Sequence, residues 1–82
     1  MREVEIITND LYEGEMVKYS QLPGILGDAK LMVPVGTDIV VLTGKSPAWV
    51  FLAVFSAIRD KTKKVVYKAI GETEGLTIYE SS

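Results

Sequence analysis

The feature that most constrains the fold is a strand-to-helix junction near the middle of the chain. Residues 39–42 read Ile-Val-Val-Leu, a continuous apolar run of the kind found in central strands buried on both faces. Gly44 then allows a turn, Ser46 is a favourable helix N-cap, and Pro47 suits the first helical position. The pattern predicts a central strand that leads into a helix ending near Arg59 or Asp60.

The segments on either side of this junction predict further strands and one more helix. Polar and apolar residues alternate over 3–8 and 15–19, which predicts an N-terminal antiparallel hairpin. Helical spacing over 22–27 predicts a short helix capped by Ser20, and residues 63–70 and 76–80 predict two strands. Tyr67 and Tyr79 on these strands are expected to form a cross-strand pair, and the alternative is that they present their rings to a base. We expect a single α+β domain over residues 1–82, with element order β-β-α-β-α-β-β and helices packed on a mixed sheet.

Composition favours a folded chain that gains from association. The chain has 82 residues, of which 48% are apolar, and it has no cysteine to form a disulfide. A small core without such cross-links makes a homodimer the expected state. The helix from Ala48 to Phe55 is apolar nearly all round, so the side away from the sheet needs cover from the first helix or from a second subunit. No apolar run spans a bilayer, and we expect a cytoplasmic protein without membrane contact.

The absence of histidine and cysteine limits the chemistry. It removes the imidazole base, the thiol nucleophile and the usual zinc ligands. Glu72 and Glu74 flank a turn without a calcium-loop pattern, and a solvated turn is favoured over a metal site there. We therefore predict no catalytic residues and no metal ligands.

The junction also has features of an anion site. The sequence Gly44-Lys45-Ser46 resembles the end of a phosphate-binding loop, but the glycine required five positions earlier is Ile39, so nucleotide hydrolysis of that type is excluded. A weaker possibility remains, in which free N–H groups at the helix N-terminus and Lys45 bind an anion. The alternative is that the turn only starts the helix.

A second candidate feature is a cluster of basic residues. Five of the nine basic side chains fall within ten positions. They are Arg59, Lys61, Lys63, Lys64 and Lys68. This cluster could bind a short anionic ligand such as an oligonucleotide, although the net charge of −2 argues against duplex DNA. The alternative is a solvated helix end beside a lysine-protected edge strand.

The junction resembles the small CRISPR-associated family called Csx-three. The shared residues are Gly44, Pro47 and Trp49, followed later by Val65-Val66-Tyr67, and the expected element order matches over nearly the whole chain. The resemblance implies a compact α+β homodimer that binds RNA or cyclic tetra-adenylate. It also implies manganese-dependent nuclease activity, so manganese or magnesium enters only through the resemblance.

The family's catalytic residues do not transfer to this chain. Its histidine falls near Lys61, its aspartate at Lys68 and its arginine at Ile70. We therefore expect a non-catalytic protein that binds RNA or cyclic oligoadenylate through Gly44, Lys45, Ser46 and the basic cluster at a homodimer surface. The alternatives are a protein interaction module without a small ligand and a nuclease that uses an oxygen-liganded divalent metal, built on Glu72, Glu74 or Asp38.

Overall fold

A computed structural model describes residues 1–81 and contains four strands and two α-helices. In chain order these are β1 (Glu3–Ile7), α1 (Leu22–Met32), β2 (Thr37–Thr43), α2 (Ala48–Ile58), β3 (Thr62–Tyr67) and β4 (Leu76–Glu80). Short 3-10 turns at Thr8–Leu11, Tyr19–Gln21 and Arg59–Lys61 join them.

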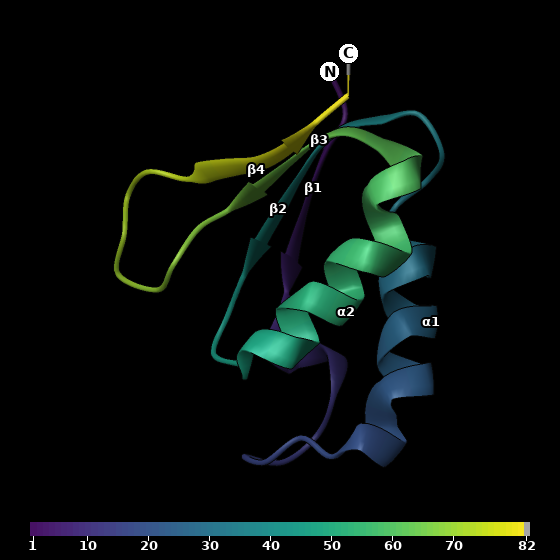
Figure 1. Ribbon diagram of the computed structural model, residues 1–82, viewed down its shortest axis with the longest axis vertical. Coiled ribbons are helices and arrows are strands. Elements are labelled where there is room, and N and C mark those ends of the chain that lie inside the picture. Colours follow the sequence, from purple (N-terminus) through teal and green to yellow (C-terminus); the bar gives the residue numbers. More distant parts are fainter. Residues whose placement is uncertain (82) are drawn as a thin grey trace.

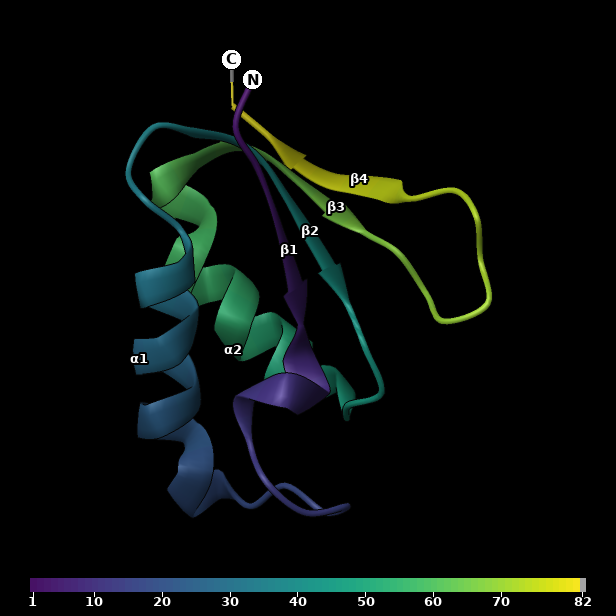
Figure 2. The same ribbon diagram turned by 180° about the vertical axis from the view of Figure 1, so that it is seen from behind.

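The strands form one mixed sheet in the order β1-β2-β3-β4. β1, β2 and β3 are parallel to one another, and β4 runs antiparallel to β3. Both crossover connections step across the sheet in the same direction, and right-handed crossovers then bring both helices to the same face. Figure 1 and the reverse view in Figure 2 show α1 and α2 on one side of the sheet. The predicted α+β class with a mixed sheet is confirmed.

One hydrophobic core lies between the sheet and the two helices. The strands contribute Ile6, Val40, Leu42 and Val65, α1 and the residue after it contribute Ile25, Ala29 and Val33, and α2 contributes Val50, Val54 and Ile58. The members of each helical set are spaced by four residues, which places them on one face of the helix. α1 packs beside α2, so the first helix provides part of the cover that α2 requires, while Leu52 stays 67% exposed.

The N-terminal hairpin predicted from the sequence is wrong in its second strand. Residues 15–19 are not extended into the sheet, and β1 pairs only with β2. The reason lies at Tyr12, whose hydroxyl hydrogen-bonds to Ser46 and holds the chain below the end of the sheet. The predicted short helix is longer than expected, because Ala29 continues the buried face of α1 beyond residue 27. The residue that precedes the helix is Gln21, not Ser20 as predicted.

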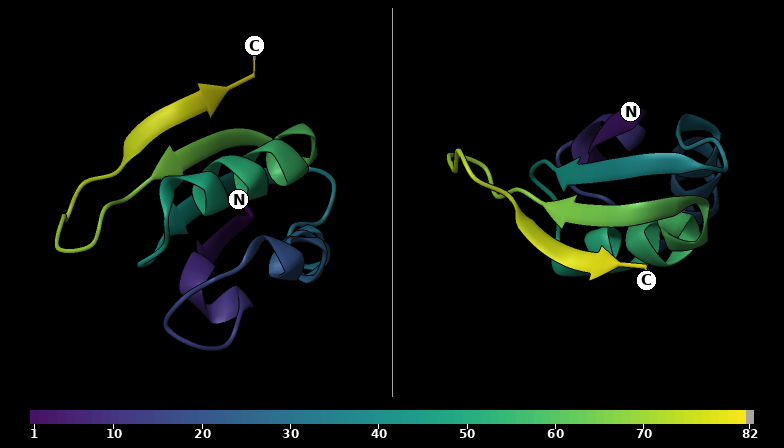
Figure 3. Two further views of the ribbon diagram at one scale, coloured as in Figure 1. Left: turned by 60° about the horizontal axis from the view of Figure 1, so that its bottom comes forward. Right: turned by 90° about the horizontal axis from the view of Figure 1, so that it is seen from above.

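The face of the sheet away from the helices has no covering element among residues 1–81. β2 turns the side chains of Ile39 and Val41 to this face, and both are half-buried. The right-hand view in Figure 3 shows the strands in front of the helices, so both helices lie on the opposite side. The prediction that β2 is buried on both faces therefore holds for one face only within a single protomer.

Within residues 1–81, none of the helices has the length and apolar character that crossing a membrane requires.

Candidate ligand site at the carboxyl edge of the sheet

The turn after β2 is built around Gly44, which has a φ of +124°. A Cβ atom on this residue would lie 2.6 Å from Asn9 Oδ1 and 2.8 Å from the backbone nitrogen of Thr8. Glycine is therefore needed both for the backbone conformation and for the close approach of the 3-10 turn that follows β1. This contact joins the ends of two neighbouring parallel strands.

Hydrogen bonds fix the turn in place. The Ser46 hydroxyl lies 2.7 Å from Thr8 Oγ1 and 2.8 Å from the Tyr12 hydroxyl. The backbone N–H of Lys45 donates to Asn9 Oδ1 at 2.9 Å, and the Tyr12 hydroxyl donates to the Lys45 carbonyl at 3.2 Å. Five residues from two segments are thus tied together, with bonded partners 33 to 38 positions apart in sequence, which gives a preorganised rim at the carboxyl edge of the sheet.

The helix start differs from the sequence prediction. Pro47 is the N-cap residue of α2, with extended backbone geometry, and no side chain caps the helix. Ser46 was predicted as the cap, but its hydroxyl is engaged by Thr8 and Tyr12 instead. The Pro47 carbonyl accepts from Val50 N at 3.0 Å. The backbone N–H groups of Ala48 and Trp49, in the first turn, have no partner within the helix, as is usual at this position.

The structure divides the eight predicted ligand residues between two ends of the sheet. Gly44, Lys45 and Ser46 lie at the carboxyl edge, and Lys68 joins them because its backbone N–H donates to the Leu42 carbonyl at 2.9 Å. The other four belong to the opposite, amino end, where β3 begins. They are Arg59, Lys61, Lys63 and Lys64. The six residues of β3 span about 20 Å, so the predicted basic cluster is two separate groups.

Two of the four basic residues at the amino end, Lys61 and Lys63, already have partners of their own. Lys61 Nζ donates to the Lys30 carbonyl at 2.9 Å, and Lys63 Nζ lies 3.5 Å from Asp38 Oδ1. The backbone N–H of Arg2 donates to Asp38 Oδ2 at 2.8 Å, and this bond together with Lys63 lowers the pKa of Asp38 below its ordinary value of 3.8. These contacts favour a structural role at this end.

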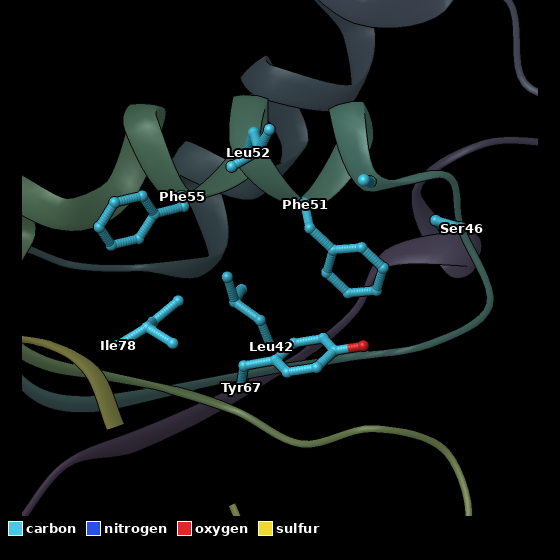
Figure 4. Close-up of a pocket in the computed structure, with 8 residues that line it drawn as sticks. Leu42, Ser46, Phe51, Leu52, Phe55, Tyr67 and Ile78 are labelled. Atoms are coloured by element: carbon cyan, nitrogen blue, oxygen red, sulfur yellow. The ribbon is translucent and has the colours of Figure 1, made fainter. Parts of the chain in front are cut away.

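An apolar groove begins beside Ser46 and runs between α2 and the strands β3 and β4. Its volume is about 520 Å³, within the usual range for small-ligand sites. Figure 4 shows Phe51, Leu52 and Phe55 on the helix side, facing Leu42, Tyr67 and Ile78 on the sheet side. Ser46 and Ala48 close the end next to the turn. The groove could take an aromatic or aliphatic group from a ligand whose charged part lies at the turn.

The two tyrosines of the last hairpin pack against α2 and not against each other. Tyr67 makes an edge-to-face contact with Phe51 at a ring-centroid distance of 5.3 Å, and Tyr79 contacts Phe55 at 5.9 Å. The predicted cross-strand tyrosine pair is wrong, because the register of the last hairpin places Tyr67 opposite Leu76 and Tyr79 opposite Val65. Sequence reasoning missed the groove for the same reason, although the phenylalanines four residues apart on α2 were its visible signal.

Two smaller hollows flank the turn. One, of about 290 Å³, is lined by Asn9, Tyr12, Gly14, Glu15 and Lys45. The other, of about 380 Å³, lies beside Trp49, whose ring packs against Tyr19 at 4.6 Å between centroids. The acid in the first hollow, Glu15, lowers the positive potential around Lys45.

No three acidic side chains within residues 1–81 gather closely enough to hold a metal ion. The carboxylate of Asp38, which was considered from the sequence as a metal ligand, accepts from the Arg2 backbone N–H and pairs with Lys63.

No family model matches the sequence, and no curated protein or solved structure is significantly similar to the chain.

Proposed function

We propose that this chain binds a short anionic ligand of the RNA or cyclic oligoadenylate class at the carboxyl edge of its sheet, without cleaving it, and does so as a homodimer. The observation that carries the proposal is the junction of a rigid, cationic turn with an apolar groove. Lys45 and Lys68 come from the ends of the neighbouring strands β2 and β3, and the groove begins at Ser46, the residue after Lys45. A nucleotide has the matching combination of a phosphate and an apolar ring.

Each part of such a ligand has a counterpart in the site. A phosphate at the turn would accept from the free N–H groups of the first turn of α2 and pair with the lysine ammonium groups. A base entering the groove would contact the rings of Phe51 and Tyr67. The resemblance to the CRISPR-associated family at Gly44, Pro47 and Trp49 supports oligoadenylate as the ligand to test first.

The proposal excludes catalysis on the basis of the residues present. The positions that resemble the family's histidine and aspartate are Lys61 and Lys68. They lie at opposite ends of β3 within one protomer, and a lysine ammonium is a phosphate ligand rather than a general base at neutral pH.

The experiment is a titration with cyclic tetra-adenylate and with a linear adenylate tetranucleotide, followed by the fluorescence of Trp49, the only tryptophan. Lys45→Glu and Lys68→Glu should each weaken binding about tenfold or more, the loss expected when a charged hydrogen bond to phosphate is removed. Arg59→Glu makes the same charge change at the other end of the sheet and serves as the matched control. Affinity should fall as salt rises. Equal losses for all three variants would refute a site at the carboxyl edge.

A gain-of-affinity variant complements these losses. Glu15 shares a hollow with Lys45, so Glu15→Gln should strengthen anion binding by about twofold to fivefold, an effect of up to about 1 kcal/mol for an exposed charge. Glu13→Gln, on the same loop but outside the hollow, is its control. Unchanged affinity for Glu15→Gln would place the ligand elsewhere.

The second candidate is a protein interaction module. Leu52 is 67% exposed and Ile78 44% exposed at the groove, and apolar side chains in this position suit the surface of a partner protein. Copurification followed by light scattering would detect such a complex. Leu52→Lys would abolish it, whereas the ligand titration would still depend on Lys45.

A further inference from the structure

The outer side of β1 is a regular, unpaired edge of the sheet. β1 is the first strand in the sheet order, and its five residues pair in register with β2 without a bulge. Among residues 1–81, no strand pairs with its other side. An edge of this kind presents backbone N–H and C=O groups to which another strand can add.

The bonds to β2 identify the backbone groups that point outward. The Arg2 carbonyl accepts from two backbone N–H groups at the start of β2, at 3.0 and 3.2 Å, so the backbone of Arg2 points toward β2. Successive residues of a strand point their backbone groups to opposite sides. Even-numbered residues of β1 therefore bond toward β2, and the free outward groups belong to Glu3, Glu5 and Ile7.

The same three residues turn their side chains to the open face of the sheet. Glu3 and Glu5 are exposed and Ile7 is 37% exposed. The alternate positions face the core, where Ile6 is fully buried but Val4 is only partly buried. A strand added here would meet two carboxylates on the open face and uncovered apolar surface on the core side.

We propose that this edge binds an extended segment of another protein in which basic and apolar residues alternate. Its basic side chains lie beside Glu3 and Glu5 as cross-strand ion pairs, and its apolar side chains cover Val4. The outward backbone groups of β1 supply the hydrogen bonds, and the alternating pattern supplies the specificity.

The two glutamates select against a second copy of this strand. In a full antiparallel pairing of two β1 strands, Glu5 would face its own counterpart. Like charges directly opposite each other are destabilising, whereas a lysine or arginine at that position stabilises the pair. The occupant is therefore a different chain of opposite charge, and its binding requires neither the proposed nucleotide ligand nor a homodimer.

The other edge of the sheet is less suited to strand addition. β4 carries a bulge at Ile78, which interrupts the regular spacing of outward groups. The acid on β4, Glu80, already lies beside Lys64 of β3. The glutamates of β1 lie beside apolar residues of β2, and neither forms an ion pair within residues 1–81.

Titration with a designed peptide tests the edge. The probe is Lys-Val-Lys-Val-Lys with acetylated and amidated ends, and Glu-Val-Glu-Val-Glu is the charge-reversed control. At low salt the basic peptide should shift the backbone amide resonances of β1 with a dissociation constant of about 0.1–1 mM, and the acidic peptide should not bind. Equal binding of the two peptides, or no shift in β1 at about 5 mM basic peptide, would overturn the inference.

Backbone methylation separates strand addition from simple charge attraction. In either strand direction, only one set of peptide nitrogens faces β1, either those of the lysines or those of the valines. One of the two N-methylated peptides should therefore lose binding at least tenfold, while the other retains it. Equal binding of both would show that charge alone holds the peptide, and would refute strand addition.

Two proline substitutions test which edge is used. Glu5→Pro removes an outward N–H that makes no bond within the sheet, so the fold should survive, as far-UV circular dichroism would show, while peptide binding is lost. Glu80→Pro is the matched control on β4, because the Ser81 N–H donates to the Lys63 carbonyl at 2.8 Å and the N–H of Glu80 therefore points outward. It should leave binding unchanged.

Glu5→Gln separates the charge from the backbone. This variant keeps the outward N–H and should weaken peptide binding by up to about fivefold. Loss of binding by Glu80→Pro and not by Glu5→Pro would place the peptide on the other edge and contradict the inference. If Glu5→Pro does not fold, the two N-methylated peptides decide the question on the parent protein.

Discussion

Replacing Gly44 with alanine tests whether the turn after β2 is pressed against the 3-10 turn after β1. A non-glycine residue at positive φ costs about 1–2 kcal/mol. The added Cβ would also lie 2.6 to 2.8 Å from atoms of Asn9 and Thr8. Steric overlap of this kind costs a further amount of about 1–3 kcal/mol. We expect Gly44→Ala to lower the free energy of unfolding by about 2–5 kcal/mol, a large part of the total for a domain of this size.

The measurement is urea denaturation followed by far-UV circular dichroism and by Trp49 fluorescence. Gly36→Ala is the matched control, because Gly36 also has a positive φ, +89°, but has open space where its Cβ would stand. Gly36→Ala should cost only the conformational part, about 1–2 kcal/mol. Equal destabilisation by the two variants would show that the close approach of Gly44 to Asn9 and Thr8 contributes nothing, and the rigid-rim argument would fail.

Three further substitutions test separate parts of the structure. Ser46→Ala should lower the free energy of unfolding by about 1–2 kcal/mol in the same assay, since it leaves two part-buried hydroxyls without their partner; a neutral result would contradict the network. Asp38 has a lowered pKa in the folded state, so its stabilising contribution is complete above its ordinary pKa of 3.8 and is lost as the pH falls through the folded-state value. The difference in free energy of unfolding between Asp38→Asn and the parent should therefore vanish in strong acid. A difference that does not change with pH would contradict this prediction. Ile58→Ala, fully buried in the core, should cost about 2–5 kcal/mol and Leu52→Ala less than about 1 kcal/mol, and thermal denaturation that ranks them the other way would contradict the core assignment.

The central strand and the helix after it could be predicted because local signals and tertiary packing agree there. The apolar run at 39–42 lies inside β2, and the helix predicted to end near Arg59 ends at Ile58. β4 has the predicted bounds, 76–80. The strand and the helix are long apolar runs, and all three segments are bounded by glycine or proline, which are conditions under which sequence reasoning works well.

The prediction of an N-terminal hairpin is wrong because the conformation of its second segment depends on contacts with residues that are far away in sequence. Residues 15–19 alternate as a strand would, but the hydrogen bond from Tyr12 to Ser46 keeps the segment away from β1. The same hydrogen-bond network explains why Ser46 does not cap the helix: its hydroxyl bonds to Thr8 and Tyr12 and fixes the turn instead. Neither contact has a local signal, since the partners are more than 30 positions apart.

The candidate site was predicted in part. Residues 44–46 stay together because they are one turn, and Lys68 joins them through the pairing of β3 with β2. The remaining basic residues are close to Lys68 in sequence. They lie far from it in space, because an extended strand adds about 3.3 Å for each residue along its length. The groove depends on which side chains of β3 and β4 face α2, and these are set by the pairing of β3 with β2 and by the bulge at Ile78 in β4.

The most direct test of the account is a titration of isotope-labelled protein with cyclic tetra-adenylate at low salt, followed by backbone amide chemical shifts. The account predicts shifts in residues 43–49, in Tyr67 and Lys68 and along the groove, while the amides around Arg59 and Lys61 stay in place. Binding without those shifts, or no binding at ligand concentrations of about 50 μM, would contradict a ligand site at the carboxyl edge of the sheet.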